Sequence, residues 1–429
     1  MSESALYLDN AATSFPKPRA VYDAMLRYGT EVGASPGRGQ YRASREGAAL
    51  IRRCRERLAG LLNAEDPGQI VFTLNTTDAL NLAIKGVARQ RRLTRPGAPL
   101  RIVTTAMDHN SVLRPLDALA AEDVDVVVVP ADPVSGLVSP AEVARAIDGW
   151  TALVAVNMVS NVGGTIQPIA EIAACCQRAG VPILLDAAQA LGHLPVDVRA
   201  VGADFVAFPG HKGLLGPQGT GGLYVRPASA SLLATTREGG TGSWSESRSQ
   251  PESMPERFES GSHNTIGIAG LSEAVQWIRD RGVESLRAHE LGLIRVMLEG
   301  LRGAGCRHPA WEAPGGGPLS AFRLLGPGDA ESRVGVFALV HDVLSPAEVA
   351  AGLESGFGVL ARAGLTCAPL AHETFGTSAG GGACRLSIGP FVTEANIERA
   401  LVALRGVGGV GGAGGDPEAA GVGSGRTVA

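Results

Sequence analysis

Short apolar runs alternate with helix-like stretches through the middle of the chain, and this alternation limits the possible folds more than any other feature of the sequence. Residues 77–91 and 170–179, for example, have a helical pattern and lie between apolar runs. Strands that alternate with helices are joined by crossovers, which give a mostly parallel sheet covered on both faces. We therefore predict an α/β fold. The predicted strands are residues 70–73, 101–105, 124–129, 153–157, 183–186, 205–208 and 222–225.

The later part of the chain follows a different pattern. Residues 228–262 are rich in Ser, Gly, Glu, Arg and Pro, which predicts a long loop. Helical periodicity then returns and mixes with strand-like segments, so we predict a smaller α+β domain. Residues 406–429 are mostly Gly, Ala and Val and cannot bury enough surface to become ordered. The predicted divisions are an N-terminal segment joining the small domain (1–15), a large domain (16–262), the small domain (263–405) and a disordered tail (406–429).

Lys212 follows directly on the predicted strand 205–208, in a glycine-rich turn. Open α/β sheets bind ligands beyond the carboxyl ends of their strands. A lysine that is partly removed from water there has a lowered pKa and can act as a nucleophile at neutral pH. Taken alone, a lysine in such a turn is an ordinary surface residue, so its interpretation depends on the residues upstream.

Asp186 ends the preceding apolar run, and Gln189 follows it closely. A carboxylate at a buried strand end costs several kcal/mol unless a cation or a strong donor pairs with it. A protonated pyridine nitrogen is such a partner, and pyridoxal phosphate sites combine this Asp with a Lys Schiff base. Asp186 could instead cap the next helix. Together with His211 and Lys212, however, Asp186 and Gln189 favour a pyridoxal phosphate site.

Several ordered motifs make the sequence resemble a known family. Over residues 5–405 it is similar to the class V aminotransferase group of fold-type I pyridoxal phosphate enzymes, and within it to the cysteine desulfurases. The resemblance implies a seven-stranded, mostly parallel sheet with helices on both faces, a smaller domain and a homodimer. The segments that carry it are YLDNAAT (7–13), MDHNS (107–111), SNVGGT (160–165), DAAQ (186–189), GHKG (210–213), GPQGTGG (216–222), FESGSHNT (258–265) and residues 362–369.

The resemblance also implies a set of cofactor contacts. Lys212 would bind pyridoxal phosphate covalently and later move the substrate Cα proton. Asp186 would pair with the pyridine nitrogen, Gln189 would bond the ring 3-oxygen, and His109 would stack on the ring and act as acid or base. The remaining implied contacts are Asn161 near the 3-oxygen and the substrate carboxylate, Thr76, Thr77 and His211 at the phosphate, and Ser262 at the phosphate of the neighbouring subunit.

Pro209 departs from the family pattern. Many relatives have Ser or Thr at this position, and its hydroxyl contacts the phosphate, whereas proline offers neither a hydroxyl nor an N–H. Phosphate binding would then depend more on the other implied contacts. Thr76 and Thr77 begin a predicted helix whose free N–H groups favour an anion, although Thr76 could also be an ordinary N-cap.

The resemblance also implies where the substrate binds. Arg385 matches the arginine that binds the amino acid α-carboxylate through a bidentate fork. The alternative is a surface arginine. Asn10 and Ala11 match a segment that passes close to the substrate, and Arg38, in a glycine-rich loop, is a further candidate for the pocket.

Cys367 decides between reaction types, because it lies in a segment resembling the family's mobile catalytic-cysteine loop. In a desulfurase its thiolate takes the substrate sulfur as a persulfide and leaves L-alanine. No histidine is adjacent to Cys367, so His109 or the substrate is the candidate proton acceptor. Alternatively, Cys367 is a small buried apolar residue. Cys384, beside Arg385, is interpreted as a packing residue.

Composition excludes several other classes. The net charge is −4 without a long basic run, which argues against nucleic acid or an anionic membrane as the main partner. No apolar stretch is long enough to span a bilayer, and the N-terminus lacks a signal-peptide pattern. The six cysteines are scattered, and no metal-ligand spacing occurs. These features favour a cytoplasmic protein without a metal.

We therefore predict a pyridoxal phosphate-dependent cysteine desulfurase that acts on L-cysteine and passes persulfide sulfur to an acceptor protein, for iron–sulfur cluster assembly or another thio-cofactor. One alternative is another enzyme of the same fold: a class V aminotransferase, an epimerase or a selenocysteine lyase. The other alternative is a cofactor-free scaffold or regulator.

Overall fold

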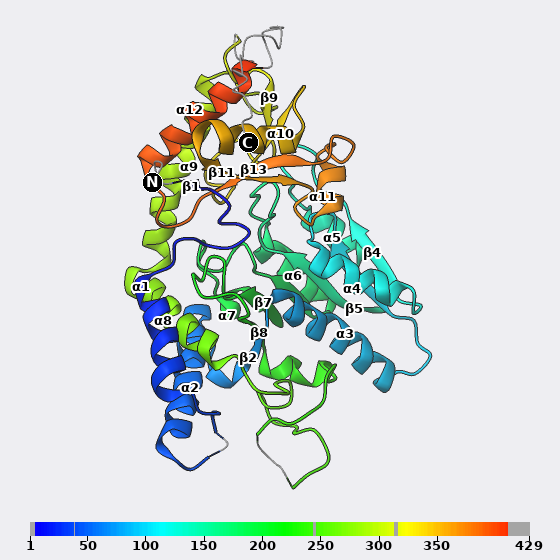
Figure 1. Ribbon diagram of the computed structural model, residues 1–429. Helices are drawn as coiled ribbons and strands as arrows, with labels where there is room; N and C mark the ends of the chain where they lie inside the picture. Colours follow the sequence, from blue (N-terminus) through cyan, green and yellow to red (C-terminus); the bar gives the residue numbers. More distant parts are fainter. Residues whose placement is uncertain (1–4, 38, 243–245, 313–315, 411–429) are drawn as a thin grey trace, which may run out of the picture.

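The computed structural model describes residues 5–37, 39–242, 246–312 and 316–410. The chain forms a larger body around one sheet, and a smaller body at the opposite end of the molecule (Figure 1). The first strand and the last helix both lie in the smaller body, so the described part of the chain begins and ends there.

The larger body is centred on a seven-stranded sheet in the order β2-β8-β7-β6-β5-β3-β4. Strand β8 is antiparallel to both of its neighbours, and all other neighbouring pairs are parallel. This confirms the predicted mostly parallel sheet. The strands are β2 (Ile70–Thr73), β3 (Arg101–Thr105), β4 (Asp125–Val129), β5 (Thr151–Asn157), β6 (Ile183–Asp186), β7 (Phe205–Pro209) and β8 (Gly221–Val225).

Helices cover both faces of this sheet, because successive strand residues point to opposite sides. In β2, Ile70 and Phe72 join one apolar core and Val71 joins the other. The second core is completed by α3 (Thr76–Thr94) and α4 (Asn110–Ala120). The first core is completed by α1 (Arg19–Arg27), α2 (Arg42–Leu62), α5 (Pro140–Ala146), α6 (Ile169–Ala179), α7 (Val198–Val201) and α8 (Thr265–Arg281). Short helical turns lie at Tyr28–Val32, Pro67–Gln69 and Pro227–Leu232.

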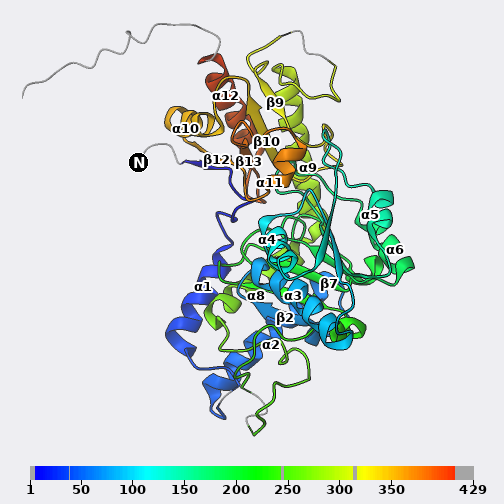
Figure 2. The ribbon, with the colours of Figure 1, turned by 90° about the vertical axis from the view of Figure 1, so that its right-hand side faces the viewer.

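The smaller body contains an antiparallel four-stranded sheet, β12-β13-β10-β9, with its own apolar core. The N-terminal strand β1 (Leu6–Tyr7) pairs in parallel with β11 (Val359–Leu360), which ties the start of the chain to this body. Figure 2 shows the helices of this body grouped beside its strands. The other elements are β9 (Phe322–Leu324), β10 (Val336–His341), β12 (Arg362–Gly364), β13 (Ala383–Ser387), α9 (Val283–Gly303), α10 (Pro346–Phe357), α11 (Pro369–Thr374) and α12 (Glu394–Val410).

Two boundaries differ from the sequence-based divisions. Helix α8 was assigned to the small domain, but its buried residues, such as Leu271 and Val275, belong to the core of the larger body. Helix α12 continues to Val410, so residues 406–410 are helical rather than part of a tail. The glycines that suggested disorder allow close packing, since a side chain at Gly406 would collide with the Phe357 ring. Residues 411–429 lie outside the described residues.

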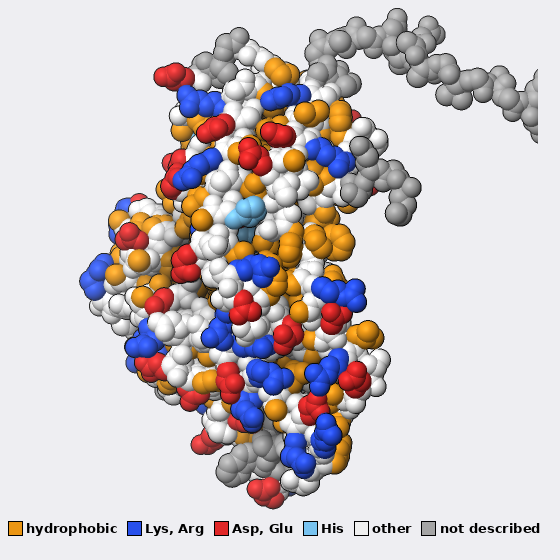
Figure 3. Space-filling view, turned by 90° about the vertical axis from the view of Figure 1, so that its left-hand side faces the viewer, with side chains coloured by type: hydrophobic (Ala, Val, Ile, Leu, Met, Phe, Trp, Pro, Cys, Tyr) orange, Lys and Arg blue, Asp and Glu red, His pale blue; other side chains and the backbone are white. Residues whose placement is uncertain are grey.

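None of the described helices is both long and apolar enough to cross a bilayer. The described His, Cys, Asp and Glu side chains form no group of three or more that could hold a metal ion. On the face in Figure 3, basic and acidic side chains are interspersed, so this face has no extended region of one charge.

Candidate active site

A pocket opens at the carboxyl ends of the parallel strands, where the loops after β2, β3, β5, β6 and β7 meet. Parallel strands deliver these loops to one edge of the sheet, which explains why residues far apart in sequence converge there. Eight of the predicted cofactor residues line this pocket: Thr76, Thr77, His109, Asn161, Asp186, Gln189, His211 and Lys212.

Lys212 and Asp186 form the charged centre of the pocket. Burial lowers the pKa of Lys212 to about 8, and the Asp186 carboxylate opposes this shift. Burial raises the pKa of Asp186, while a hydrogen bond of 2.9 Å from the backbone N–H of Ala188 and the Lys212 charge act in the opposite direction. An amine with a pKa near 8 is about one-tenth unprotonated at pH 7, far more than an ordinary lysine. The pocket therefore contains a nucleophilic amine beside a buried carboxylate.

The N-terminus of α3 forms another wall. Asn75 caps this helix by accepting a hydrogen bond from the N–H of Asp78, and Thr76 and Thr77 begin it. The Thr77 hydroxyl lies 2.8 Å from the Ser111 hydroxyl. Free N–H groups and hydroxyls at the start of a long helix attract anions.

His211 adds an unpaired polar atom to this region. Its Nδ1 is buried and has no hydrogen-bond partner among the described residues. Burial, followed by the positive charges of Lys212 and Lys17, lowers the pKa of His211 to about 4, so the ring is neutral at pH 7. A buried and unpaired ring nitrogen costs free energy, which a polar ligand would recover.

His109 is held in one orientation at the start of α4. Its Nδ1 accepts a hydrogen bond of 3.0 Å from the backbone N–H of Ser111, which leaves the ring proton on Nε2. Burial, and then the charges of Lys212 and Arg385, lower the pKa of His109 to about 4. His109 is therefore a neutral imidazole at physiological pH.

Asp108 and Asn157 were not singled out from the sequence. The fully buried Asp108 carboxylate accepts hydrogen bonds of 2.7–2.8 Å from Thr104, from the N–H and hydroxyl of Thr105, and from the N–H of Asn157. Burial raises its pKa to about 6. Asp108 thus joins the ends of β3 and β5 and fixes the neighbouring His109. A carboxylate three residues after the end of a strand that finishes in two threonines was the available signal.

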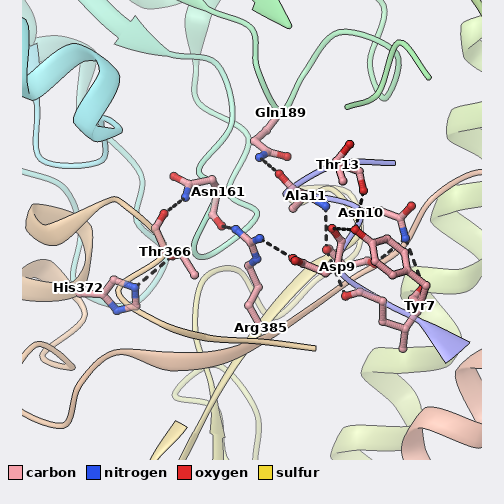
Figure 4. Close-up of polar contacts among 12 residues, drawn as sticks. Tyr7, Asp9, Asn10, Ala11, Thr13, Asn161, Gln189, Thr366, His372 and Arg385 are labelled. Carbon is pink, nitrogen blue, oxygen red and sulfur yellow. Dashed lines mark hydrogen bonds and ion pairs between the residues drawn. The ribbon is translucent and has the colours of Figure 1, made fainter. Parts of the chain in front are cut away.

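Arg385 lies at the boundary with the smaller body and is 3% exposed. Its guanidinium donates to the backbone O of Asn161 at 3.0 Å and to the Asp9 carboxylate at 2.9 Å, while its Nε is buried without a partner among the described residues (Figure 4). This excludes the surface-arginine alternative. The counter-ion Asp9 was missed, because nothing in the sequence indicates that residues so far apart meet.

Asn10 and Ala11 connect the N-terminal segment to both bodies. The Asn10 amide donates to the backbone O of Ser387 at 3.1 Å. The N–H of Ala11 donates to the Ser387 hydroxyl, and its carbonyl accepts from the Gln189 amide, both at 2.9 Å (Figure 4). Both residues therefore lie between β13 and the pocket.

Cys367 is exposed, whereas the other cysteines are buried. The alternative in which Cys367 is a buried packing residue is therefore wrong. Its loop is hydrogen-bonded at two points beside the pocket. The amide of Asn161, a lining residue, donates to the backbone O of Thr366 at 2.7 Å, and the N–H of Asn110, which follows the lining residue His109, donates to the backbone O of Cys367 at 2.8 Å. Burial raises the pKa to about 12 for four other thiols, which stay protonated: Cys54, Cys176, Cys306 and Cys384.

The predicted cofactor residue Ser262 is not brought into this pocket. Ser262 is exposed and lines a separate hollow together with Arg237, Glu259 and His263. Arg38 lies outside the described residues.

Comparisons with known proteins agree with this fold. The chain belongs to the aminotransferase class-V family, whose model matches residues 6–400. It is similar to a probable cysteine desulfurase of Methanothermobacter thermautotrophicus, with 33% identity over 92% of both chains. A cysteine desulfurase of Yersinia pseudotuberculosis is 31% identical over 93% of this chain and 92% of its own. Among solved structures, a cysteine desulfurase from Thermococcus onnurineus NA1, in its apo form, has a TM-score of 0.83 at 28% identity over 94% of both chains.

Proposed function

We propose that this protein is a pyridoxal phosphate-dependent cysteine desulfurase that converts L-cysteine to L-alanine and retains the sulfur on Cys367. One observation carries this proposal: an exposed thiol lies on a loop that is hydrogen-bonded to Asn161, which lines the pocket, and to Asn110, which lies between the lining residues His109 and Ser111. An aminotransferase has no need for a thiol at this point. The names of the similar proteins support the same reaction.

The residues of the pocket fit pyridoxal phosphate. The cofactor carries an aldehyde, a basic ring nitrogen and a phosphate, and the pocket offers the Lys212 amine, the Asp186 carboxylate and the N-terminus of α3 with Thr76 and Thr77. The unpaired Nδ1 of His211 provides a further polar contact. When bound, pyridoxal phosphate supplies an electron sink that stabilises negative charge on the substrate carbon atoms. Gln189 and His109 complete the proposed cofactor contacts.

Separate side chains of the protein bind the substrate and hold or move the protons. Arg385 binds the substrate carboxylate, with Asp9 and Asn161 holding its guanidinium in place. Asp186 would hold the ring nitrogen of the cofactor and keep it protonated. Lys212, whose pKa is near neutrality, removes and returns the substrate Cα proton.

The sulfur step requires Cys367 as a thiolate. The thiolate attacks the substrate sulfur, so that a sulfur–sulfur bond forms while the carbon–sulfur bond breaks. The electron pair of the broken bond remains with the substrate carbon, which takes up a proton and becomes the methyl group of alanine. Cys367 is left as a persulfide. His109 or the substrate accepts the proton that the Cys367 thiol loses, and the lowered pKa of about 4 makes His109 a weak base for this step.

The proposal also includes the oligomeric state of the enzyme and the protein that accepts its sulfur. We place the enzyme in the cytoplasm as a homodimer, with Ser262 reaching the cofactor phosphate of the second subunit. The exposure of Ser262, away from the pocket of its own chain, supports this arrangement. An acceptor protein would take the persulfide from Cys367 and deliver sulfur for iron–sulfur cluster assembly.

A single-turnover experiment tests the reaction. Cofactor-loaded protein is mixed with L-cysteine in the absence of a reductant, and alanine and the Cys367-containing peptide are analysed. We expect about one alanine per chain and one added sulfur atom on Cys367. Alanine without sulfur on any cysteine, or turnover that depends on a keto acid, would contradict the proposal and favour an aminotransferase or epimerase.

The lowered pKa of Lys212 predicts the pH dependence of cofactor uptake. Only the free amine reacts with an aldehyde, and for a pKa of about 8 its fraction rises from roughly a tenth at pH 7 to nine-tenths at pH 9. We expect the rate of pyridoxal phosphate uptake by cofactor-free protein, followed by its visible absorbance, to rise over this interval and then level off. A rate that continues to rise towards the ordinary lysine pKa would contradict the assignment.

Replacement of Arg385 by Lys tests the carboxylate contact. Lysine keeps the charge but loses the planar fork that now bonds to both Asn161 and Asp9. We expect KM for L-cysteine to rise by about 10- to 100-fold, the loss expected for one charged hydrogen bond, with a smaller change in kcat. The exposed Arg19 provides a matched control, and Arg19→Lys should leave both constants unchanged. An unchanged KM in Arg385→Lys would exclude the carboxylate contact.

A further inference from the structure

The turn that carries Cys367 has an unusual backbone. Thr366 has φ of 44° and Cys367 has φ of 59°, so two successive residues other than glycine lie in the left-handed region. This conformation is unfavourable for L-residues and is a genuine outlier for a β-branched threonine. Such a turn persists only where its surroundings hold it, and strained backbone of this kind is concentrated at functional sites.

His372 lies directly beneath this turn. It is located on α11, has no exposed surface, and places its Nε2 3.4 Å from the Thr366 hydroxyl (Figure 4). On the other side of the ring, Nδ1 lies 2.7 Å from the Thr377 hydroxyl. The N–H of Thr377 donates to the backbone O of His372 at 2.8 Å, which fixes this second contact. Both ring nitrogens are therefore used to connect the turn to the end of α11.

The imidazole acts here as a neutral connector. Burial, together with the Arg385 charge, lowers the pKa of His372 to about 4, so the ring has one donor and one acceptor at physiological pH. The ring does not line the pocket and does not contact the Cys367 side chain through any hydrogen bond given by the structure. The ring reaches this turn through the Thr366 hydroxyl and through a backbone hydrogen bond with Leu365.

The turn is also held from the pocket side. The Asn161 amide donates to the backbone O of Thr366, and the N–H of Asn110 donates to the backbone O of Cys367. These bonds fix the two carbonyl groups, whereas His372 is the residue that contacts the Thr366 side chain. Backbone and side chain are thus held from opposite sides, which is how a left-handed threonine can be maintained.

We propose that His372 is a positioning residue: it holds Thr366 in the left-handed conformation and thereby presents the Cys367 thiol to the substrate sulfur. This inference rests on the proposed function for its kinetic consequence, but its structural consequence is independent of any substrate. The ring acts on the reaction through Thr366 and takes no part in proton transfer.

The substrate-independent test uses the amide of Asn110. This N–H belongs to the first residue of α4 and therefore has no partner within the helix, so its hydrogen bond to Cys367 reports the position of the turn. In His372→Ala we expect its hydrogen exchange, measured by nuclear magnetic resonance, to accelerate by about tenfold. His341→Ala is the matched control, because it removes another buried imidazole of the smaller body away from this turn. Unchanged exchange of Asn110 in His372→Ala would overturn the proposal.

The kinetic test compares three cofactor-loaded proteins. In His372→Ala we expect kcat for alanine formation to fall by roughly 10- to 100-fold, because a displaced nucleophile loses its alignment, while KM and cofactor content stay close to those of the parent protein. His372→Gln, whose amide can reach the Thr366 hydroxyl, should recover part of the loss. Equal losses in His372→Ala and the His341→Ala control would indicate general destabilisation and contradict a specific role. If the parent protein makes no alanine, the proposed function fails, and the Asn110 measurement still decides the role of His372.

Discussion

Replacement of Lys212 by Ala is expected to give a folded protein that neither binds pyridoxal phosphate covalently nor forms alanine from L-cysteine. Lys212 is the amine that lines the pocket, and the same side chain is the proposed base for the Cα proton. Loss of a positioned acid–base group alone costs up to about 10⁴-fold in rate, and loss of the cofactor bond adds to this. Alanine formation and visible absorbance after cofactor addition measure the two effects.

The other lysines provide sharp controls for this prediction. The chain contains two more, Lys17 and Lys85. Lys85 is exposed on α3, so Lys85→Ala should behave as the parent protein. Lys17 is the stricter comparison, because burial also lowers its pKa to about 8 although it does not line the pocket. Peptide mapping after borohydride reduction should find the cofactor on Lys212, and finding it on Lys17 would contradict the site.

Cys367→Ala should retain the cofactor and lose sulfur transfer. The Cys367 side chain does not line the cofactor pocket, so the absorbance of the loaded protein should be unchanged. Without the thiolate no sulfur–sulfur bond can form, and removal of a nucleophile commonly lowers kcat on the order of 10³-fold or more. The measurement is sulfide release from L-cysteine in the presence of a reductant.

A matched cysteine variant separates a specific effect from a general one. Cys175 lies on α6, away from the pocket, and Cys175→Ala should release sulfide at the parent rate. Full sulfide release by Cys367→Ala would exclude the role assigned to this thiol. In that event the reaction would have to be sought among the other class V chemistries.

The sequence predicted the parts of the site that depend on strand ends. Lys212 and Asp186 were found because each follows an apolar run, and parallel strands bring such ends together. The strands were located for the same reason, since most of them are buried on both faces and therefore form continuous apolar runs, while the edge strand β4 is only partly buried. Information of this kind is local and can be read from a single segment.

The parts that were missed depend on contacts between distant segments. Asp9 pairs with Arg385 across nearly the whole chain, and neither residue signals the other in sequence. His372 follows Cys367 closely, yet its role depends on the left-handed turn at Thr366, which no sequence pattern indicates. The prediction that the tail begins at residue 406 was wrong because Gly406 lies in α12, where its small size allows packing against Phe357.

The most direct test of the proposed activity is turnover of L-cysteine by the purified protein with added pyridoxal phosphate and a reductant. We predict that alanine and sulfide form in equal amounts over many turnovers, without any keto acid. Protein that takes up the cofactor on Lys212 but forms neither product would keep the fold and the pocket and would contradict the desulfurase function.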